Sequence, residues 1–348
     1  MNFSEITEAL RNGQSLNAEA VEAAAAFLLD AAEDSERKAA LLRALSAKGE
    51  TAEEIAAFVK VFLRHAVRPA LDLTTMDRPV MDVCGTGGDR LNLFNISTAS
   101  MFVLAAGGVA VVKHGNRGIT SQSGGADVLE KLGISVNLPP DRFAACVQEH
   151  GAGFMLATGY HPAFRAVASA RSLLADEGVR TIFNLIGPLL NPVQPPFQLV
   201  GVYDPALPGV YAEIMRQLGR QRAWAVHGTV PGGPGMDEVS ILGPTHIVSL
   251  SGGEITEMTE SVPLPAPALE ELKGGNAHTN AAIIEGILSG EVRGAKRDIV
   301  LANAAAGFRV AGLETFWPEA IERAEAALDS GLALRVLTGL RAFSNATA

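Results

Sequence analysis

Groups suited to an anionic ligand follow the first expected strand of the chain. Residues 80–83 are expected to form a short buried strand, and Gly85, Gly87 and Gly88 come directly after it. Glycines at this density permit positive φ and leave backbone N–H groups accessible, so a loop of this kind can hold phosphate. The loop lacks both the Gly-Lys-Ser/Thr of a P-loop and the dinucleotide Gly-x-Gly-x-x-Gly. Taken alone, it is as typical of a tight turn as of a phosphate site.

A helix start and a lysine are expected beside this loop. Residues 95–98 open an apolar helical run to Ala106, and the beginning of a helix carries unpaired N–H groups and partial positive charge. Residues 109–112 form the next expected strand, which delivers Lys113 at its end. Ligands of open α/β sheets bind at the carboxyl ends of the strands. The repetition of such groups at two strand ends therefore predicts a polyanion site.

Two adjacent carboxylates, Asp237 and Glu238, follow a later expected strand and the Pro/Gly-rich loop 230–235. A solvated loop end is the simpler interpretation, because adjacent acidic residues are common. However, Mg²⁺ binds through one or two carboxylates together with substrate phosphate. Next to an expected phosphate site, the pair is a candidate for holding Mg²⁺.

The segment after the second strand carries further polar groups. Lys113 is a point charge suited to phosphate, whereas His114 is interpreted from its type alone as a structural histidine. Asn116 lies in a loop that could face a second substrate. Arg117 is expected to pair with Asp127 or another carboxylate.

Arg171 is a second candidate for binding a substrate. It lies ten residues after His161, in a helical segment that begins at His161-Pro162. Most exposed arginines have no special role, but a guanidinium can bind a substrate carboxylate through two hydrogen bonds.

Composition narrows the class of protein. Of 348 residues, 48% are hydrophobic, which supports a sizeable core and excludes a disordered chain. The net charge of −10 argues against non-specific binding to nucleic acid or to anionic membranes. The two cysteines lack metal-binding spacing. The first residues lack the features of a signal peptide, and no apolar run is long enough to span a membrane, so we expect a cytoplasmic protein.

The expected elements divide the chain into two parts. Residues 1–68 read as helices only, including one from Ala18 to Glu33, one capped by Ser35 and one begun by the capping box at residues 51–54. From Arg78 onward strands and helices alternate, which predicts an α/β sheet. The expected strands are 80–83, 109–112, 154–157, 199–203 and 223–227, and the expected helices are 97–106, 126–132, 141–150 and 209–218.

Together, these segments resemble the signatures of the anthranilate phosphoribosyltransferase family, in its order and near its spacing. The matching segments, which extend over nearly the whole chain, are Gly85–Asp89, Asn95–Thr98, Lys113–Arg117, Ser123–Asp127, His161-Pro162, Arg180–Pro188, Asn191-Pro192 and Asp237-Glu238. Family members often have serine at the position of Gly125 and threonine at that of Leu93. The segment 172–178 and the loop before Asp237 are also longer here.

The resemblance implies a small helical domain, residues 1–72, which mediates homodimerisation and is joined by the helical excursion 162–187. It implies a large α/β domain, residues 73–348, with a central, mostly parallel sheet and the active site between the domains. The implied reaction transfers phosphoribose from 5-phosphoribosyl-1-pyrophosphate (PRPP) to the amine of anthranilate in tryptophan biosynthesis.

The resemblance also implies roles for individual residues, with His114 a candidate for catalysis and no other catalytic residue assigned. The PRPP-binding residues would be Gly85, Gly88, Asp89, Asn95, Ile96, Ser97, Thr98, Lys113, His114, Gly115, Asn116, Ser121 and Gly125. The anthranilate-binding residues would be Gly85, His114, Asn116 and Arg171, and the Mg²⁺ ligands would be Ser97, Asp237 and Glu238.

Two alternatives remain open from the sequence. A pyrimidine-nucleoside phosphorylase shares the architecture but needs neither the acidic pair nor Arg171. A non-catalytic homologue that binds ligand or nucleic acid should show a basic surface and a broken acidic pair, which the net charge and the intact Asp237-Glu238 oppose.

Overall fold

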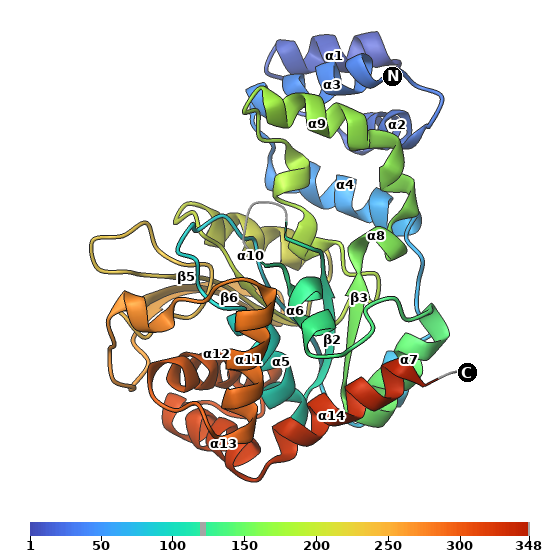
Figure 1. Cartoon of the computed structure of the whole chain (residues 1–348). Coiled ribbons are helices and arrows are strands. Elements are labelled where there is room, and N and C mark those ends of the chain that lie inside the picture. The colour runs from blue at the N-terminus through green and yellow to red at the C-terminus, as the bar shows by residue number, and fades with distance from the viewer. Residues whose placement is uncertain (119–122, 347–348) are drawn as a thin grey trace.

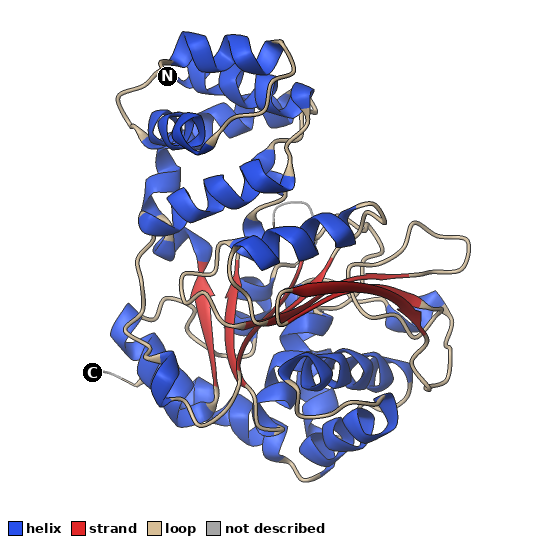
Figure 2. Ribbon diagram, turned by 180° about the vertical axis from the view of Figure 1, so that it is seen from behind, coloured by secondary structure: helices blue, strands red, loops and turns tan. Residues whose placement is uncertain are grey.

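The computed structural model describes residues 1–118 and 123–346. Ser121, expected to bind PRPP, lies outside the described residues. A helical bundle formed from the beginning of the chain stands over an α/β part that contains one sheet (Figure 1). Helices cover both faces of that sheet (Figure 2).

Four helices begin the chain, each with a polar cap at its start. They are α1 (Phe3–Arg11), α2 (Ala18–Leu29), α3 (Ser35–Lys48) and α4 (Ala52–Arg64). The expected capping box of α4 is confirmed: Thr51 and Glu54 exchange side-chain to backbone hydrogen bonds. Two expected helix ends were wrong. The second helix ends at Leu29 rather than Glu33, and Asp34, whose side chain accepts from the Arg37 N–H, caps α3 in place of Ser35.

Seven strands of the described chain form one sheet in the order β3-β2-β1-β4-β5-β6-β7. The first five pair in parallel, and the last two are antiparallel. The sequence predicted all five parallel strands, with boundaries shifted by up to three residues, and missed β6 and β7. Their bounds are β1 Val80–Gly85, β2 Ala110–Gly115, β3 Ala152–Leu156, β4 Phe197–Gly201, β5 Arg222–Gly228, β6 Thr245–Ser251 and β7 Glu254–Glu260.

Successive side chains of the central strands belong alternately to two separate hydrophobic cores. In β4, Leu199 belongs to the core under the C-terminal helices, whereas Val200 belongs to the core shared with the N-terminal helices. In β5, Trp224 and Ala225 divide in the same way. This follows from the two-residue period of a strand, which sends successive side chains to opposite faces.

Helix α10 and the N-terminal bundle cover one face of the sheet. Helix α10 packs against α4 on one side and against β5 and β6 on the other. The segment 162–187 also packs on the bundle, because its turn η2 contacts α2 and its helix α9 contacts α3. The elements of this region are α8 (Ala157–Tyr160), η2 (Pro162–Val167), α9 (Ala168–Asp176), η3 (Ile182–Asn184), η4 (Gly187–Leu189) and α10 (Leu207–Gln217).

The opposite face carries the remaining helices, with α12 packed against β4, β5 and α5. They are α5 (Ile96–Ala106), α6 (Gly125–Lys131), α7 (Pro140–His150), α11 (Ala277–Ser289), α12 (Ala295–Ala311), α13 (Trp317–Asp329) and α14 (Leu332–Asn345). Within the described ranges, no helix has the length and apolarity needed to cross a bilayer.

Candidate active site

The acidic pair lies directly over the carboxyl ends of the parallel strands. Asp237 and Glu238 belong to the connection from β5 to β6. A Cβ placed on Gly85, at the end of β1, would overlap the Asp237 carboxylate, and one on Gly201, at the end of β4, would overlap the Asp237 carbonyl. Glycine at both strand ends is therefore what allows the acidic pair to approach the sheet.

The glycine loop after β1 is closed onto Asp237. Gly87 and Gly88 both have positive φ, of 71° and 95°, and the Gly87 N–H donates to Asp237 Oδ2 at 2.6 Å. Asp89 accepts from the Leu91 N–H through Oδ1. The positive φ values explain why glycines are needed here, and the loop does place a backbone donor at the site.

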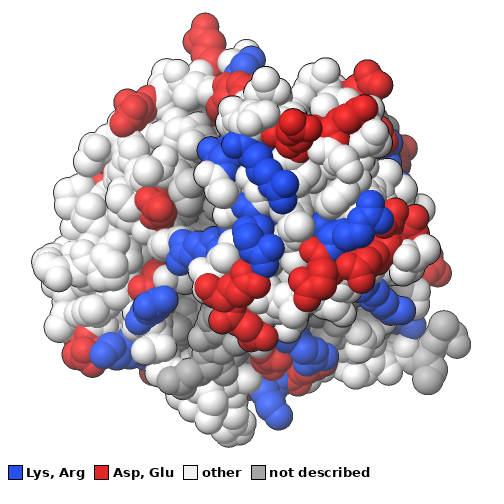
Figure 3. Space-filling view, turned by 90° about the horizontal axis from the view of Figure 1, so that it is seen from above, with Lys and Arg blue, Asp and Glu red and all other residues white. Residues whose placement is uncertain are grey.

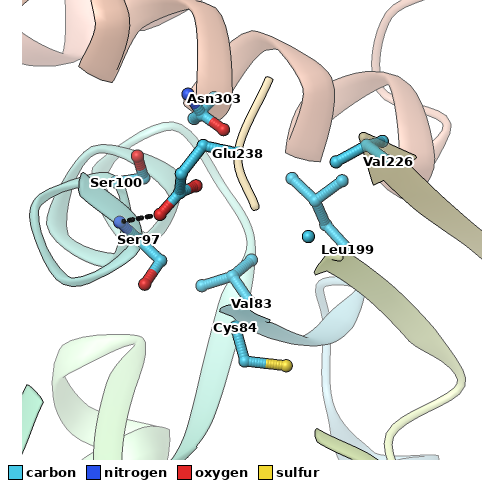
Figure 4. A pocket seen from close by; sticks show the side chains of 9 residues that line it. Val83, Cys84, Ser97, Ser100, Leu199, Val226, Glu238 and Asn303 are labelled. Atoms are coloured by element: carbon cyan, nitrogen blue, oxygen red, sulfur yellow. Dashed lines mark hydrogen bonds between the residues drawn. The ribbon is translucent and has the colours of Figure 1, made fainter. Parts of the chain in front are cut away.

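The beginning of α5 and Lys113 meet at the same point. Glu238 Oε1 accepts from the Ser97 N–H at 3.2 Å, as Figure 4 shows. Lys113 is 4% exposed, and its Nζ donates to Ser97 Oγ at 3.1 Å and to the Val83 carbonyl at 2.5 Å. Because Lys113 is the residue that β2 supplies, two strands and one helix converge as the sequence predicted.

Negative charge exceeds positive charge in this cluster. Burial, followed by the charge of Asp89, raises the pKa of Asp237 to about 7. Burial and then Asp237 raise the pKa of Glu238 well above its usual range, and Lys113 opposes this rise. Burial likewise raises the pKa of Asp89. Carboxyl groups held this closely need a cation if all of them are to be ionised.

The donor set fits a magnesium ion whose coordination is completed by substrate. Asp237, Glu238 and the Ser97 hydroxyl are hard oxygen ligands of the type Mg²⁺ prefers. No group of three His, Cys, Asp or Glu side chains with metal-binding geometry occurs in residues 1–118 and 123–346. Because Mg²⁺ takes six oxygen ligands and usually binds through one or two carboxylates, the two carboxylates suit a metal that arrives with phosphate oxygens.

A row of aromatic contacts connects His114 with Arg171. The His114 ring lies edge-to-face with His161 at 5.2 Å between centroids, and His161 stacks on Phe164 at 5.1 Å. Phe164 meets Phe183 at 5.4 Å, and the Arg171 guanidinium lies 5.0 Å from the Phe183 centroid. The row thus runs from β2 to α9, which packs on the N-terminal bundle.

His114 is held as a neutral ring. Burial, and secondarily the neighbouring His161, lowers its pKa to about 3, although a backbone hydrogen bond with Gly187 opposes the shift. Nε2 of His114 has no hydrogen-bond partner among the described residues. A buried ring nitrogen without a partner is unusual in a folded protein, so His114 is a candidate for a role beyond the purely structural one expected from residue type.

The remaining expected site residues lie around the loop after β2. Asn95 accepts from Asn280 at 2.9 Å and donates to the Ser123 carbonyl at 3.2 Å. Arg117 forms two hydrogen bonds with Glu130 and also reaches Asp127, which confirms that it pairs with carboxylates.

The remaining residues expected to bind substrate differ in how far they are exposed to solvent. Ile96 and Thr98 are buried in the first turn of α5, Asn116 is exposed, and Gly115 ends β2. Gly125 is the first residue of α6, and a Cβ placed on it would lie next to Thr98 and Lys113.

Sequence reasoning missed polar residues below the site. Asp82 is buried in β1 and receives the His114 N–H at 3.4 Å. Burial raises the pKa of Asp82 to about 6, and the neighbouring Asn191 side chain opposes this rise. Oδ2 of Asp82 has no partner in the described chain. An aspartate within the apolar run Val-Met-Asp-Val was a usable sequence signal for such a group.

Two family models together match most of the chain. One family model, described as "Glycosyl transferase family, a/b domain", matches residues 77–334, and another, "Glycosyl transferase family, helical bundle domain", matches residues 4–66. The chain thus has both domains of a two-part glycosyltransferase family. Anthranilate phosphoribosyltransferase of Moorella thermoacetica is 46% identical over 308 residues, covering 88% of this chain and 87% of the relative. That of Rubrobacter xylanophilus is 41% identical, covering 95% of each. The chain belongs to the anthranilate phosphoribosyltransferase family, which confirms the resemblance.

Solved structures agree with this assignment. The anthranilate phosphoribosyltransferase from Thermus thermophilus superposes with a TM-score of 0.88 at 38% identity, covering 98% of this chain and 99% of that one. The Saccharomyces cerevisiae enzyme in complex with PRPP and Mg gives a TM-score of 0.85 at 26% identity, covering 98% and 97%. The predicted fold class is confirmed: a small helical part and a large α/β part with a mostly parallel sheet.

Proposed function

We propose that this protein transfers the phosphoribosyl group of PRPP to the amine of anthranilate, giving N-(5-phosphoribosyl)anthranilate and pyrophosphate, with Mg²⁺ at the acidic pair. The observation that carries the proposal is the convergence of the glycine loop, the beginning of α5, Lys113 and Asp237-Glu238 at one edge of the sheet. The membership of the chain in the family, and the yeast relative solved with PRPP and Mg, support the same reaction.

The pyrophosphate of PRPP would bind between Lys113 and the glycine loop. As the bond at ribose C1 lengthens, the sugar gains oxocarbenium character and pyrophosphate accumulates negative charge. Lys113 lies 3.1 Å from Ser97 Oγ, where its ammonium and the first turn of α5 face that charge. We assign PRPP binding to the glycine loop, residues 95–98 and residues 113–116 with Gly125; Ser121 stays a prediction outside the described residues.

Mg²⁺ would be held by Asp237 and Glu238, with the Ser97 hydroxyl as a further ligand. The N–H groups of Gly87 and Ser97 already donate to these carboxylates. An unaccompanied pyrophosphate would therefore meet negative charge there. The cation would supply charge neutralisation between the carboxylates and the phosphates.

Anthranilate would be oriented by Arg171, with His114 and Asn116 nearer the ribose. The Arg171 guanidinium is half-buried against Phe183, a position suited to a carboxylate on an aromatic ring. The aniline nitrogen is already nucleophilic and needs no strong base, so positioning supplies much of the rate. A 4-fluoroanthranilate complex of the yeast relative supports an aromatic acceptor of this type.

An assay of anthranilate fluorescence tests the reaction. Wild-type protein with Mg²⁺ and PRPP should consume anthranilate, and omission of either should stop the loss. Phosphorolysis of thymidine in the presence of inorganic phosphate, without use of anthranilate, would favour the nucleoside phosphorylase alternative and overturn the proposal.

The double variant Asp237→Ala/Glu238→Ala tests the metal assignment separately. It should lose Mg²⁺-dependent turnover while keeping the circular dichroism of the wild type. Undiminished turnover at saturating Mg²⁺ would show that the pair does not hold the cation.

We further propose that residues 1–72, together with 162–187, form the dimerisation domain beside a catalytic domain of residues 73–348. Figure 3 views the molecule from above, at the end where the N-terminal bundle stands, and shows basic and acidic side chains intermixed there. A face of mixed sign can pair with a second copy of itself. Light scattering should give twice the chain mass at micromolar protein, and a monomer would contradict the assignment. A cytoplasmic location also stays a prediction, which cell fractionation checks.

A further inference from the structure

We infer that Asn303, on α12, is a positioning residue that holds Asp237 and Glu238 in the geometry needed for the cation. The inference rests on the proposed role of the acidic pair in binding Mg²⁺. Asn303 is 2% exposed and belongs to none of the sequence segments that mark the family resemblance.

The acidic pair is flanked on both sides by anchored residues. Before it, Met236 exchanges two backbone hydrogen bonds with Gly228 at the end of β5, of 2.8 and 3.0 Å. After it, the Asn303 side chain forms two hydrogen bonds with the backbone of Val239. It accepts from the Val239 N–H at 2.8 Å and donates to the Val239 carbonyl at 3.0 Å. Between these two anchors stand only Asp237 and Glu238.

The amide of Asn303 acts here as a substitute for a neighbouring strand. Its oxygen and its nitrogen engage the N–H and the C=O of one residue, which is what a backbone partner does in a ladder. The same nitrogen also donates to the Ile299 carbonyl at 2.9 Å, one turn earlier in α12, and this bond fixes the rotamer. A buried amide is costly unless it is hydrogen-bonded, and this amide is bonded at both ends.

Helix α12 makes this anchor rigid. It is packed against α5, α13 and the strands β4 and β5, and most of its residues, from Ile299 to Phe308, are buried. The loop before the pair, residues 231–234, is exposed. Asn303 therefore links the two carboxylates to a rigidly packed helix and restrains their positions. Figure 4 shows Asn303 beside Glu238.

Variants at Asn303 should weaken cation binding. Asn303→Ala removes both bonds to Val239, and loss of a residue that orients metal ligands typically lowers metal affinity about 10–100-fold. We expect such a loss for Mn²⁺, measured by electron paramagnetic resonance in the presence of pyrophosphate. The anthranilate KM should stay within about twofold of wild type. Asn303→Asp, of equal size, keeps only the bond from the Val239 N–H and should weaken Mn²⁺ binding in the same direction.

A matched control separates this effect from general destabilisation. Ser344, on α14, is also buried and accepts a backbone hydrogen bond from Ser135 at 3.0 Å. Ser344→Ala should lower thermal stability without changing Mn²⁺ affinity. If Asn303→Ala merely loses stability as Ser344→Ala does, and binds Mn²⁺ like wild type, the inference is overturned.

Two measurements keep the test decisive. In wild-type protein, the Val239 amide should exchange its hydrogen far more slowly than that of Gly232; equal rates would overturn the inference without any variant. Unchanged Mn²⁺ binding by Asp237→Ala/Glu238→Ala would instead refute the metal assignment itself. Loss of binding in that double variant, with wild-type binding in both Asn303 variants, would refute only the role of Asn303.

Discussion

The carbonyl oxygen of Asp237 occupies the space in which a Cβ of Gly201 would lie. The obstacle is backbone, which cannot rotate away as a flexible side chain could. Gly201→Ala should therefore displace the acidic pair, lower Mg²⁺-dependent kcat and cost about 1–3 kcal/mol of unfolding free energy from overpacking. Steady-state kinetics and urea unfolding measure the two effects. Gly209→Ala is the control: among the described residues, nothing beyond its own stretch of helix lies within 4 Å of its Cβ position, so activity should be kept.

The acceptor site is tested at Arg171. Loss of a charge-assisted, two-point contact with a carboxylate costs about 1.5–3 kcal/mol, so Arg171→Ala should raise the anthranilate KM by roughly 10- to 100-fold. The PRPP KM should hardly change, because Lys113 is untouched. Arg171→Lys should recover only part of the loss, since an ammonium is a point charge. The matched control is Arg165→Ala, at an exposed arginine, which should leave the anthranilate KM unchanged. A parallel rise of both KM values, or of neither, would make Arg171 structural.

Gly125 has room for the serine common in the family. Its Cβ would lie 3.4 Å from Thr98 Oγ1 and 3.9 Å from Lys113 Cε, which is ordinary contact. Gly125→Ser should add a hydroxyl near the expected phosphates and lower the PRPP KM about two- to tenfold, the equivalent of one hydrogen bond of about 0.5–1.5 kcal/mol. Gly125→Ala fits equally well without the hydroxyl and should leave that KM unchanged. Equal kinetics of the two variants would show that no phosphate reaches this position.

The neutral state of His114 predicts a pH effect on stability. Its pKa is about 3 in the folded protein and about 6.5 when unfolded. Between these values the unfolded chain binds more protons, so this residue contributes stability above pH 6.5 that is lost as pH falls. Asp82 and Asp237, whose pKa values are raised, act in the opposite direction.

The informative quantity is therefore the difference between wild type and His114→Phe. Urea unfolding at pH 7, 6 and 5 should show that wild type loses more stability on acidification, by up to about 1.4 kcal/mol per pH unit. Replacement of the exposed His278 by Asn should not change the slope. Identical slopes for wild type and His114→Phe would contradict a neutral, buried His114.

The sequence predicted the parallel half of the fold because its strands are short apolar runs that end in glycine or in functional residues. It failed for β6 and β7: every residue of β7 is at least partly exposed, so this strand has no strong apolar signal. It also failed to locate Asn303 and Asn280, since an asparagine within an Ala-rich helix reveals its partner only once distant elements are packed together. Contacts such as that of Asn303 with Val239 span 64 positions, which no local pattern contains.

The apolar core beneath the N-terminal helices joins the two parts of the chain. That core runs from Ile6 in α1 through Phe62 in α4 to Val200 and Ala225 in the sheet, yet the two family models divide the chain between residues 66 and 77. The evolutionary modules are therefore not separate folding units, because a fragment cut at that boundary would leave one face of the sheet exposed to water. Arg171 and Lys113 both fall within residues 77–334, yet α9, which carries Arg171, packs on α3 of the N-terminal helices. The position of Arg171 relative to Lys113 therefore depends on this shared interior.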